Sequence, residues 1–244
     1  MGKPDYSQLE LPSPLPERPY VLMNMVMSVD GKAVVDGDEG GLGSDIDRRL
    51  MREVRTNADV ILVGASTLRA TGASSRLGAE DLEQIRIDSG RSRFPMASLL
   101  SRSGALPLEK IFFTARDFDA VVYLTDETPE QAFEAARDTG RPVVRLPSAD
   151  TVRAMLRHMR GELGAEVLLL EGGPSTNAEF FRRNLVDELF VTVGAVVVGG
   201  RETPTIVEGP GGGSTKDLVP MQLVSATPNA ETDELYLRYK VRRD

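Results

Sequence analysis

The stretch that most constrains the fold of this chain runs from Glu166 to Asn177 and reads EVLLLEGGPSTN. Val167 to Leu170 form a continuous apolar run, which is typical of a parallel strand that is buried on both faces. The run ends at Glu171 and is followed by two glycines, a proline and a segment with helical character, Ser175 to Leu185. This order of elements predicts an α/β protein.

The turn after this strand has two interpretations of about equal weight. Bare glycine backbone and the N–H groups of a helix N-terminus form a site for an anion such as a phosphate. Glu171 would then lie at the mouth of a cleft, because open α/β sheets bind ligands at the carboxyl ends of their strands. The sequence Gly172-Gly173-Pro174 also suits an ordinary tight turn, since it matches neither G-x-G-x-x-G nor a P-loop.

A second apolar run, Asp59 to Val63, also ends in a glycine, Gly64, and continues with Ala-Ser-Thr. Ser66 or Thr67 would cap a short helix whose amide groups face a phosphate. Two such turns beside each other in one sheet would form a dinucleotide cleft. The repetition therefore favours a ligand site at both turns.

A third strand, Met96 to Leu100, continues into Ser101 and Arg102. A guanidinium group holds a phosphate through two parallel hydrogen bonds, so this pair suits the phosphate of a 2′-phosphorylated ribose. A simple polar turn is the alternative.

The first strand of the globular part is predicted at Tyr20 to Met27 and contains one polar residue, Asn24. A buried side chain of this polarity needs a hydrogen-bond partner, which would be either structural or a ligand. The strand ends in SVDGK, a turn that brings together the Ser28 hydroxyl, the Asp30 carboxylate and the Lys32 amine.

A helix is predicted to follow, with Ser44 as its N-cap. Three arginines form a stripe on it: Arg48, Arg52 and Arg55. We expect Arg48 and Arg52 to lie on a solvated face. Arg55 follows Val54 at the inner edge of the helix and is the better candidate for binding a ligand anion.

The rest of the chain alternates between strand-like and helical segments. Strands are predicted at Lys110–Ala115, Ala120–Thr125, Pro142–Leu146 and Glu188–Val198, and helices at Pro129–Thr139 and Thr151–Leu163. Met221–Ala226 and Glu234–Val241 are predicted to form an antiparallel hairpin. The sheet is therefore expected to be mostly parallel with an antiparallel C-terminal end. The segment from Thr71 to Arg93 is ambiguous, apart from a short charged helix near Ala79 to Ile87.

Composition narrows the classes of protein and partner. The net charge of −8 disfavours a nucleic acid or a membrane surface as partner, although a local positive site would still bind an anion. No apolar run approaches the roughly 18 residues of a membrane span. The absence of cysteine fits a reducing compartment, so we expect a cytoplasmic protein. The single histidine, His158, is expected at the surface, and no pattern of metal ligands is present.

Residues 1–18 contain no apolar signal core and end in a proline-rich stretch. We expect them to form an extended lead-in. No convincing linker or internal repeat follows, so residues 19–244 are predicted to form a single domain.

These motifs, taken in order, resemble those of the riboflavin-biosynthesis pyrimidine reductase family, a dihydrofolate reductase-like domain that is often fused to a deaminase. The resemblance extends from about Pro19 to the C-terminus. It is carried by Asn24 with SVDGK, the segment Ser44–Arg55, VGAST at 63–67, LSRSG at 100–104, LLLEGGPST at 168–176, LVDEL at 185–189 and VGG at 198–200. It implies a three-layer α/β/α fold, a homodimer and the use of NADPH.

The resemblance also implies roles for individual residues. The pyrophosphate of NADPH would be bound by the turn that comprises Gly172, Gly173, Pro174, Ser175 and Thr176. Thr67, on the facing turn, would assist. Ser101 and Arg102 would bind the 2′-phosphate. The substrate, a 5-amino-6-(5-phosphoribosylamino)pyrimidine, would contact Glu171, Arg55 and Asn24. Catalysis, which reduces the ribosylamino side chain to ribitylamino, would involve Glu171, Asp30 and Lys32.

One segment departs from the family pattern. After VGAST the family continues with an acidic D-x-P-x-L segment that ends near an arginine, whereas this chain has LRATGASSRL. Arg76 would replace the arginine that binds the substrate phosphate, and Thr71 stands where an acid is common. A chain without cysteine also cannot build the zinc site of the fused deaminase.

Three functions therefore stay open. The first is the NADPH-dependent reductase of the riboflavin-pathway pyrimidine. The second is a reductase of another heterocycle, such as dihydrofolate, because the segment at residues 68–78 is altered. The third is a non-catalytic nucleotide-binding protein.

Overall fold

The computed structural model describes residues 2–35, 40–210 and 214–243. Its strands are β1 (Tyr20–Ser28), β2 (Val60–Gly64), β3 (Met96–Ser101), β4 (Ala120–Thr125), β5 (Val143–Leu146), β6 (Val167–Leu170), β7 (Glu188–Gly194), β8 (Met221–Pro228) and β9 (Leu235–Val241). Its helices are α1 (Asp45–Thr56), α2 (Ala65–Thr71), α3 (Glu80–Asp88), α4 (Ile111–Thr114), α5 (Glu130–Asp138), α6 (Thr151–Gly161) and α7 (Pro174–Arg182). Short 3₁₀ turns lie at Ser148–Asp150 and Thr215–Asp217.

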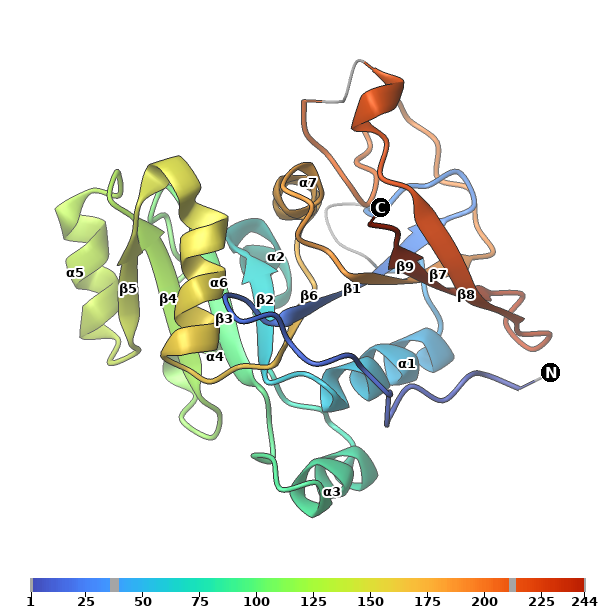
Figure 1. The fold of residues 1–244 in the computed structure, drawn as a ribbon, viewed down its shortest axis with the longest axis horizontal. Helices are drawn as coiled ribbons and strands as arrows, with labels where there is room; N and C mark the ends of the chain where they lie inside the picture. Colours follow the sequence, from blue (N-terminus) through green and yellow to red (C-terminus); the bar gives the residue numbers. More distant parts are fainter. Residues whose placement is uncertain (1, 36–39, 211–213, 244) are drawn as a thin grey trace.

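The nine strands in the described ranges belong to one sheet, in the order β5-β4-β3-β2-β6-β1-β7-β9-β8 (Figure 1). The strands from β5 to β7 are parallel. The last two strands, β9 and β8, are antiparallel to their neighbours. The predicted sheet, mostly parallel with an antiparallel C-terminal hairpin, is confirmed. This order places the carboxyl ends of β3, β2, β6 and β1 next to one another.

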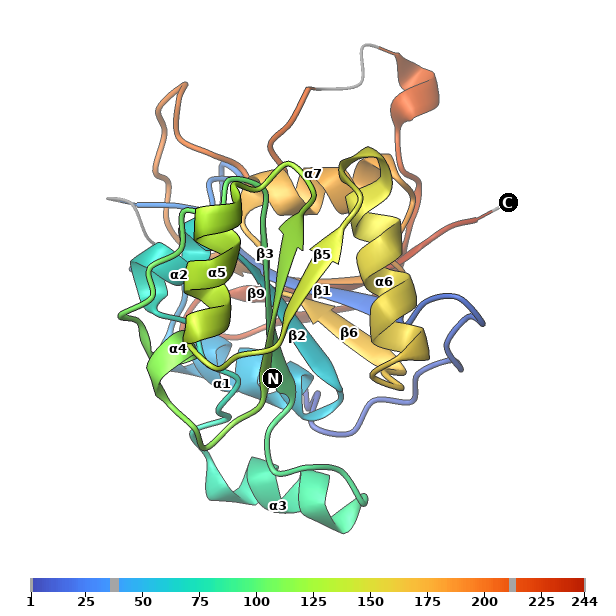
Figure 2. The ribbon, with the colours of Figure 1, turned by 90° about the vertical axis from the view of Figure 1, so that its left-hand side faces the viewer.

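Helices cover both faces of the sheet, which confirms the predicted three-layer α/β/α arrangement. Apolar residues of α1, α2, α4 and α5 pack in one buried cluster against one face, and those of α6 and α7 pack in a second cluster against the other. Figure 2 shows α2, α4 and α5 on one side of the sheet and α6 on the opposite side. The third helix of the chain, α3, packs beside α1, where Arg49 of α1 binds Asp81.

Two predicted strands are wrong in kind or extent. Within the strand predicted at 110–115, Ile111–Thr114 form the short helix α4, because Phe112 and Phe113 are both buried in the same cluster, whereas a strand would send them to opposite faces. The strand predicted to reach Val198 ends at Gly194. There the Leu42 carbonyl lies so close to the backbone that a side chain at Gly194 would overlap it.

His158 is half-buried, which corrects its predicted surface position. Its Nδ1 lies 3.0 Å from the hydroxyl of Tyr123, a buried residue of β4. Burial lowers the pKa of His158. The histidine therefore contributes to the packing of α6 on the sheet.

The N-terminal lead-in lies against the domain. Tyr6 is buried, and its ring packs edge-to-face on Phe190 of β7. Glu53 of α1 accepts a hydrogen bond from the Tyr6 amide, and Asn57 donates one to the Tyr6 carbonyl. These contacts add a side chain of the lead-in to the core.

No helix in the described ranges is long and apolar enough to cross a membrane.

Candidate active site

The two turns with the strand-glycine pattern lie side by side, as predicted from their sequences. The Gly64 amide at the end of β2 donates a hydrogen bond of 2.8 Å to the Gly172 carbonyl after β6. A Cβ atom on Gly64 would lie 2.9 Å from that carbonyl oxygen and 3.1 Å from Thr176 Oγ1. Glycine at this position therefore allows the two turns to approach each other closely.

The turn after β6 leads directly into α7 and leaves its N-terminus open. Gly173 is the N-cap, with a φ of 86° that favours glycine, and Pro174 occupies the first turn. Among the described residues, no side chain caps this end of α7. The amide groups of the first turn have no partner within the helix, so the residues at the α7 N-terminus fit a phosphate group.

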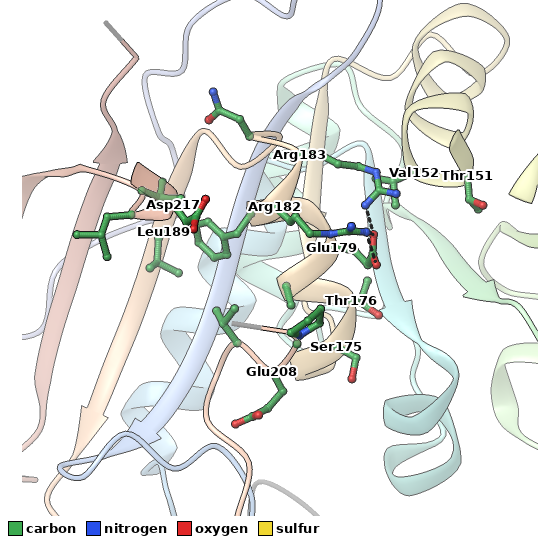
Figure 3. A pocket seen from close by; sticks show the side chains of 18 of the residues that line it. Thr151, Val152, Ser175, Thr176, Glu179, Arg182, Arg183, Leu189, Glu208 and Asp217 are labelled. Atoms are coloured by element: carbon green, nitrogen blue, oxygen red, sulfur yellow. Dashed lines mark hydrogen bonds and ion pairs between the residues drawn. The ribbon is translucent and has the colours of Figure 1, made fainter. Parts of the chain in front are cut away.

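A cavity of about 1140 Å³ runs along α7 (Figure 3). Ser175 and Thr176 line it from the helix, and Arg102 lines it from the end of β3. Of the residues predicted to bind the cofactor, Ser175, Thr176 and Arg102 therefore share one cavity. A 2′-phosphorylated dinucleotide fits this set of donors.

Ser101 and Thr67 do not face this cavity. Ser101 is buried, and its Oγ accepts a hydrogen bond of 3.2 Å from the Gly104 amide, so it shapes the turn after β3. Thr67 lies in the first turn of α2, whose N-cap is Gly64. The prediction that Ser66 or Thr67 caps this helix is therefore wrong, and the Ser66 side chain lies outside the described part of the chain.

Arg55 and Glu171 form a bidentate ion pair on the α1 side of the sheet. Arg55 Nε lies 2.6 Å from Glu171 Oε1, and Arg55 Nη2 lies 2.7 Å from Oε2. The two side chains are only 14% and 11% exposed. Both residues were predicted at the site from the sequence, but their pairing was not. The anion that Arg55 binds is the carboxylate of Glu171.

Arg55 also holds the segment that departs from the family pattern. Its Nη1 donates to the carbonyls of Ser74 and Arg76, at 3.3 and 3.1 Å. The Arg76 side chain itself binds Asp117, at 2.7 and 2.8 Å. The structure therefore does not bring the Arg76 guanidinium to Glu171, because its charge is already paired with a surface carboxylate.

Asn24 lies next to this ion pair. The parallel register that pairs Met23 with Leu170 puts Asn24 and Glu171 one residue further along, on the same face of the sheet. Asn24 is half-buried, and within the described ranges no hydrogen bond is formed by its side-chain amide. Of the two interpretations of Asn24, the ligand-facing one is favoured.

Asp30 and Lys32 bind the loop that follows β7. The Asp30 carboxylate accepts hydrogen bonds from the Ser28 hydroxyl and from the amides of Val198 and Gly199, at 2.7, 3.0 and 2.8 Å. These bonds, the one from Ser28 foremost, lower the pKa of Asp30 to about 2. Lys32 Nζ donates a bond of 2.8 Å to the Thr203 carbonyl.

Three further groups around α7 were not predicted from the sequence. Asn177 is fully buried, and its side-chain amide donates a hydrogen bond of 2.8 Å to the Ile206 carbonyl. Its side chain leaves no room for a side chain at Gly172. Glu179 and Arg183 line the cavity. Ser175, Glu179 and Arg183 recur every four residues, and this helical spacing was the signal that could have placed them on one face.

Comparison with known proteins identifies the family of this chain. The family model described as the RibD C-terminal domain matches residues 19–231. A 2,5-diamino-6-ribosylamino-4(3H)-pyrimidinone 5′-phosphate reductase of Aquifex aeolicus is 27% identical over 86% of this chain and 91% of its own length. The reductase of the same name from Methanothermobacter thermautotrophicus is 27% identical over 92% of this chain and 99% of its own length.

Solved structures show the same fold. The crystal structure of a pyrimidine reductase-like protein from Corynebacterium diphtheriae superposes with a TM-score of 0.81 at 22% identity, covering 93% of each chain. A dihydrofolate reductase from Enterococcus faecalis superposes with a TM-score of 0.50 at 12% identity, covering 92% of this chain and 97% of its own. The predicted dihydrofolate reductase-like fold is confirmed.

Proposed function

Because this chain belongs to the RibD C-terminal domain family, we propose that it is the NADPH-dependent reductase of a 5-amino-6-(5-phosphoribosylamino)pyrimidine in riboflavin biosynthesis. Its reaction converts the ribosylamino side chain to ribitylamino. The observation that carries this proposal is the position of the Arg55–Glu171 pair beside the open N-terminus of α7. A polar group for the substrate and an anion site for the cofactor thus lie at adjacent strand ends.

NADPH, when bound, supplies the hydride for the reduction. On the side of the protein, the amide groups at the start of α7 and the hydroxyls of Ser175 and Thr176 would hold the pyrophosphate. Gly173 lets the backbone approach it, because it carries no side chain, whereas the space beside Gly172 is filled by Asn177. Arg102, on the opposite wall of the cavity, would bind the 2′-phosphate.

The residues on the α1 side of the sheet would orient the substrate. Arg55 holds the Glu171 carboxylate in one orientation, so that Glu171 can accept hydrogen bonds from ribose hydroxyls or from an amino group of the pyrimidine. The side-chain amide of Asn24 can donate to and accept from the same ligand. Positioning of this kind contributes to the rate by holding the ribose carbon in place for reduction.

Asp30 and Lys32 would act through the loop they hold. A carboxyl group with a pKa of about 2 is ionised at neutral pH and does not donate a proton there. We therefore assign Asp30 the role of fixing the loop at Val198 and Gly199 beside the site. Lys32, bound to the Thr203 carbonyl, fixes the same loop further along.

The decisive experiment compares substrates. The purified protein should oxidise NADPH when either the diamino or the deaminated ribosylaminopyrimidine phosphate is added. Mass spectrometry should show that the product carries a ribityl chain. The ratio of the two rates identifies the natural form of the pyrimidine. Turnover of dihydrofolate alone would replace this proposal by a pterin reductase.

The pterin alternative has one supporting observation. Arg76, the candidate for the arginine that the family pattern places at the substrate phosphate, is bound to Asp117. A substrate without a phosphate would not need it. NADPH binding without turnover of any of these substrates would instead favour a non-catalytic nucleotide-binding protein.

The resemblance to the family further supports a cytoplasmic homodimer. The edge strand β8 exposes Leu223 and Val224, and an apolar edge of this kind suits an interface between copies. Light scattering after size-exclusion chromatography should give the mass of a dimer. A monomer at micromolar concentration would contradict this assignment.

A further inference from the structure

Three arginines converge on one carboxylate in the wall of the cavity along α7. Glu179 Oε1 lies 3.2 Å from Arg102 Nη2, and both oxygens of Glu179 lie 2.8 Å from Arg182 Nη2. Arg183 also donates to Glu179 Oε2. Figure 3 shows Arg182, the last residue of α7, and Arg183, the residue that follows it, turned toward Glu179 of the same helix. We call these four residues the Glu179 cluster.

The Glu179 cluster has more positive than negative charge. Among the described residues, Glu179 is the one carboxylate that forms an ion pair with Arg102, Arg182 or Arg183. Burial raises the pKa of Glu179, but the bonds and charges of the arginines outweigh it and lower this pKa below its usual value. Glu179 is therefore ionised at neutral pH, and two positive charges of the cluster remain uncompensated.

The cluster lies one helical turn along the cavity from the predicted pyrophosphate site. Ser175 and Glu179 are four residues apart on α7, which corresponds to a rise of about 6 Å. Arg102 faces them from the end of β3. A ligand with two phosphate groups separated by about this distance would therefore place one at the helix N-terminus and the other at the Glu179 cluster.

We propose that Glu179 holds the place of the 2′-phosphate of NADPH in the free protein and releases Arg102, Arg182 and Arg183 to that phosphate when the cofactor binds. This inference rests on the proposed function and adds Glu179, Arg182 and Arg183 to the recognition of the cofactor. A phosphate monoester carries nearly two negative charges and three acceptor oxygens, so it matches the surplus charge better than a carboxylate does. NADH presents a neutral hydroxyl at this position and cannot replace Glu179.

The carboxylate is tested by Glu179→Gln, which removes its charge but keeps its size. Isothermal titration calorimetry should show NADPH binding tighter by roughly three- to fivefold, because the arginines no longer have to leave an ion pair. NADH binding should stay unchanged. Weaker NADPH binding by this variant would overturn the proposal, since Glu179 would then only orient the arginines.

The arginines are tested by Arg182→Gln and Arg183→Gln. Each should weaken NADPH binding by about tenfold, the loss of one charge-assisted bond, without affecting NADH. Arg157→Gln is the matched control: Arg157 lies on the neighbouring helix α6, pairs with Asp150 and does not line the cavity, so neither cofactor should be affected. Equal loss of NADPH and NADH binding in the two α7 variants would overturn the proposal.

A nicotinamide-free probe separates this inference from the proposed function. Adenosine 2′,5′-bisphosphate and 5′-AMP differ only in the 2′-phosphate. If the protein binds neither NADPH nor NADH, the proposed function fails. Tighter binding of the bisphosphate, abolished by Arg183→Gln, would still support the Glu179 cluster as a phosphate site, and equal binding of the two nucleotides would overturn it.

Discussion

Arg55 and Glu171 lie 116 residues apart in the sequence and are joined by two parallel hydrogen bonds of 2.6 and 2.7 Å. The pair connects α1 to the end of β6, and through the carbonyls of Ser74 and Arg76 it also holds the segment after α2. One guanidinium group thus fixes a candidate catalytic carboxylate and a wall of the site. Both the stability of the protein and its activity should depend on it.

Arg55→Met should leave the Glu171 carboxylate largely buried without its partner. We expect a loss of about 3 kcal/mol in the free energy of unfolding and a decrease of at least about tenfold in kcat. Arg55→Lys should recover part of both, because it restores the charge but not the second hydrogen bond. Urea unfolding and steady-state kinetics measure the two effects.

Arg48→Met is the control for this prediction. Arg48 lies on the same helix and pairs with Asp45, but both side chains are more than half exposed. Its removal should change the free energy of unfolding by less than about 1 kcal/mol. An Arg55→Met protein as stable as the Arg48→Met protein would show that the Arg55–Glu171 pair contributes little.

Gly172→Ala should disrupt the turn before α7, because the added Cβ atom would overlap Asn177 Oδ1. We expect destabilisation of about 2 kcal/mol and weaker NADPH binding. Gly161→Ala is the matched control, since nothing lies within 4 Å of its Cβ position at the end of α6. That variant should be as stable as the unmutated protein or slightly more stable, by thermal unfolding.

Asp187→Asn should destabilise the protein at neutral pH and reduce its sensitivity to acid. Asp187 is buried and binds Arg18, Arg243 and the Val21 amide. Burial raises the pKa of Asp187, but these partners outweigh it and the pKa is lower than usual. The stabilisation by ionised Asp187 is therefore fully present above about pH 4 and is lost as the pH falls through the lowered pKa of the folded protein.

Urea unfolding between pH 7 and pH 3 checks this prediction. The unmutated protein should lose more stability over this range than Asp187→Asn does. The stability difference between the two proteins should stay constant from pH 8 to pH 5. A difference that grows between pH 5 and pH 7 would point to a group other than Asp187.

Asp30→Asn tests whether Asp30 positions a loop or transfers a proton. With a pKa of about 2, Asp30 keeps its charge across the accessible range, so kcat/KM of the unmutated enzyme should show no acid limb from this residue between pH 5 and pH 8. The variant should be slower because the amides of Val198 and Gly199 lose a charged acceptor. Its pH profile should keep the same shape. A shifted profile would identify Asp30 as a proton carrier.

The sequence by itself determined most of the elements and indicated the end of the sheet at which the candidate site lies. Apolar runs such as Val167–Leu170 must be buried on both faces, so they can only be inner strands of a covered sheet. Glycines at the ends of β2 and β6 indicated where backbone approaches backbone. The hairpin formed by β8 and β9 was equally readable, because its strands are local neighbours in the sequence.

The tertiary structure alone decided which charges meet. Arg55 and Glu171 looked like two independent ligand contacts, and Arg76 looked like a phosphate ligand, because ionic pairing depends on side chains far apart in the sequence. In the folded chain Arg55 binds Glu171 and Arg76 binds Asp117. The same holds for Glu179, whose three arginines come from α7 and from the end of β3. Apolar burial follows a local period that can be read along the chain, whereas an ion pair requires two distant positions to be brought within about 4 Å, and only the folded sheet does this.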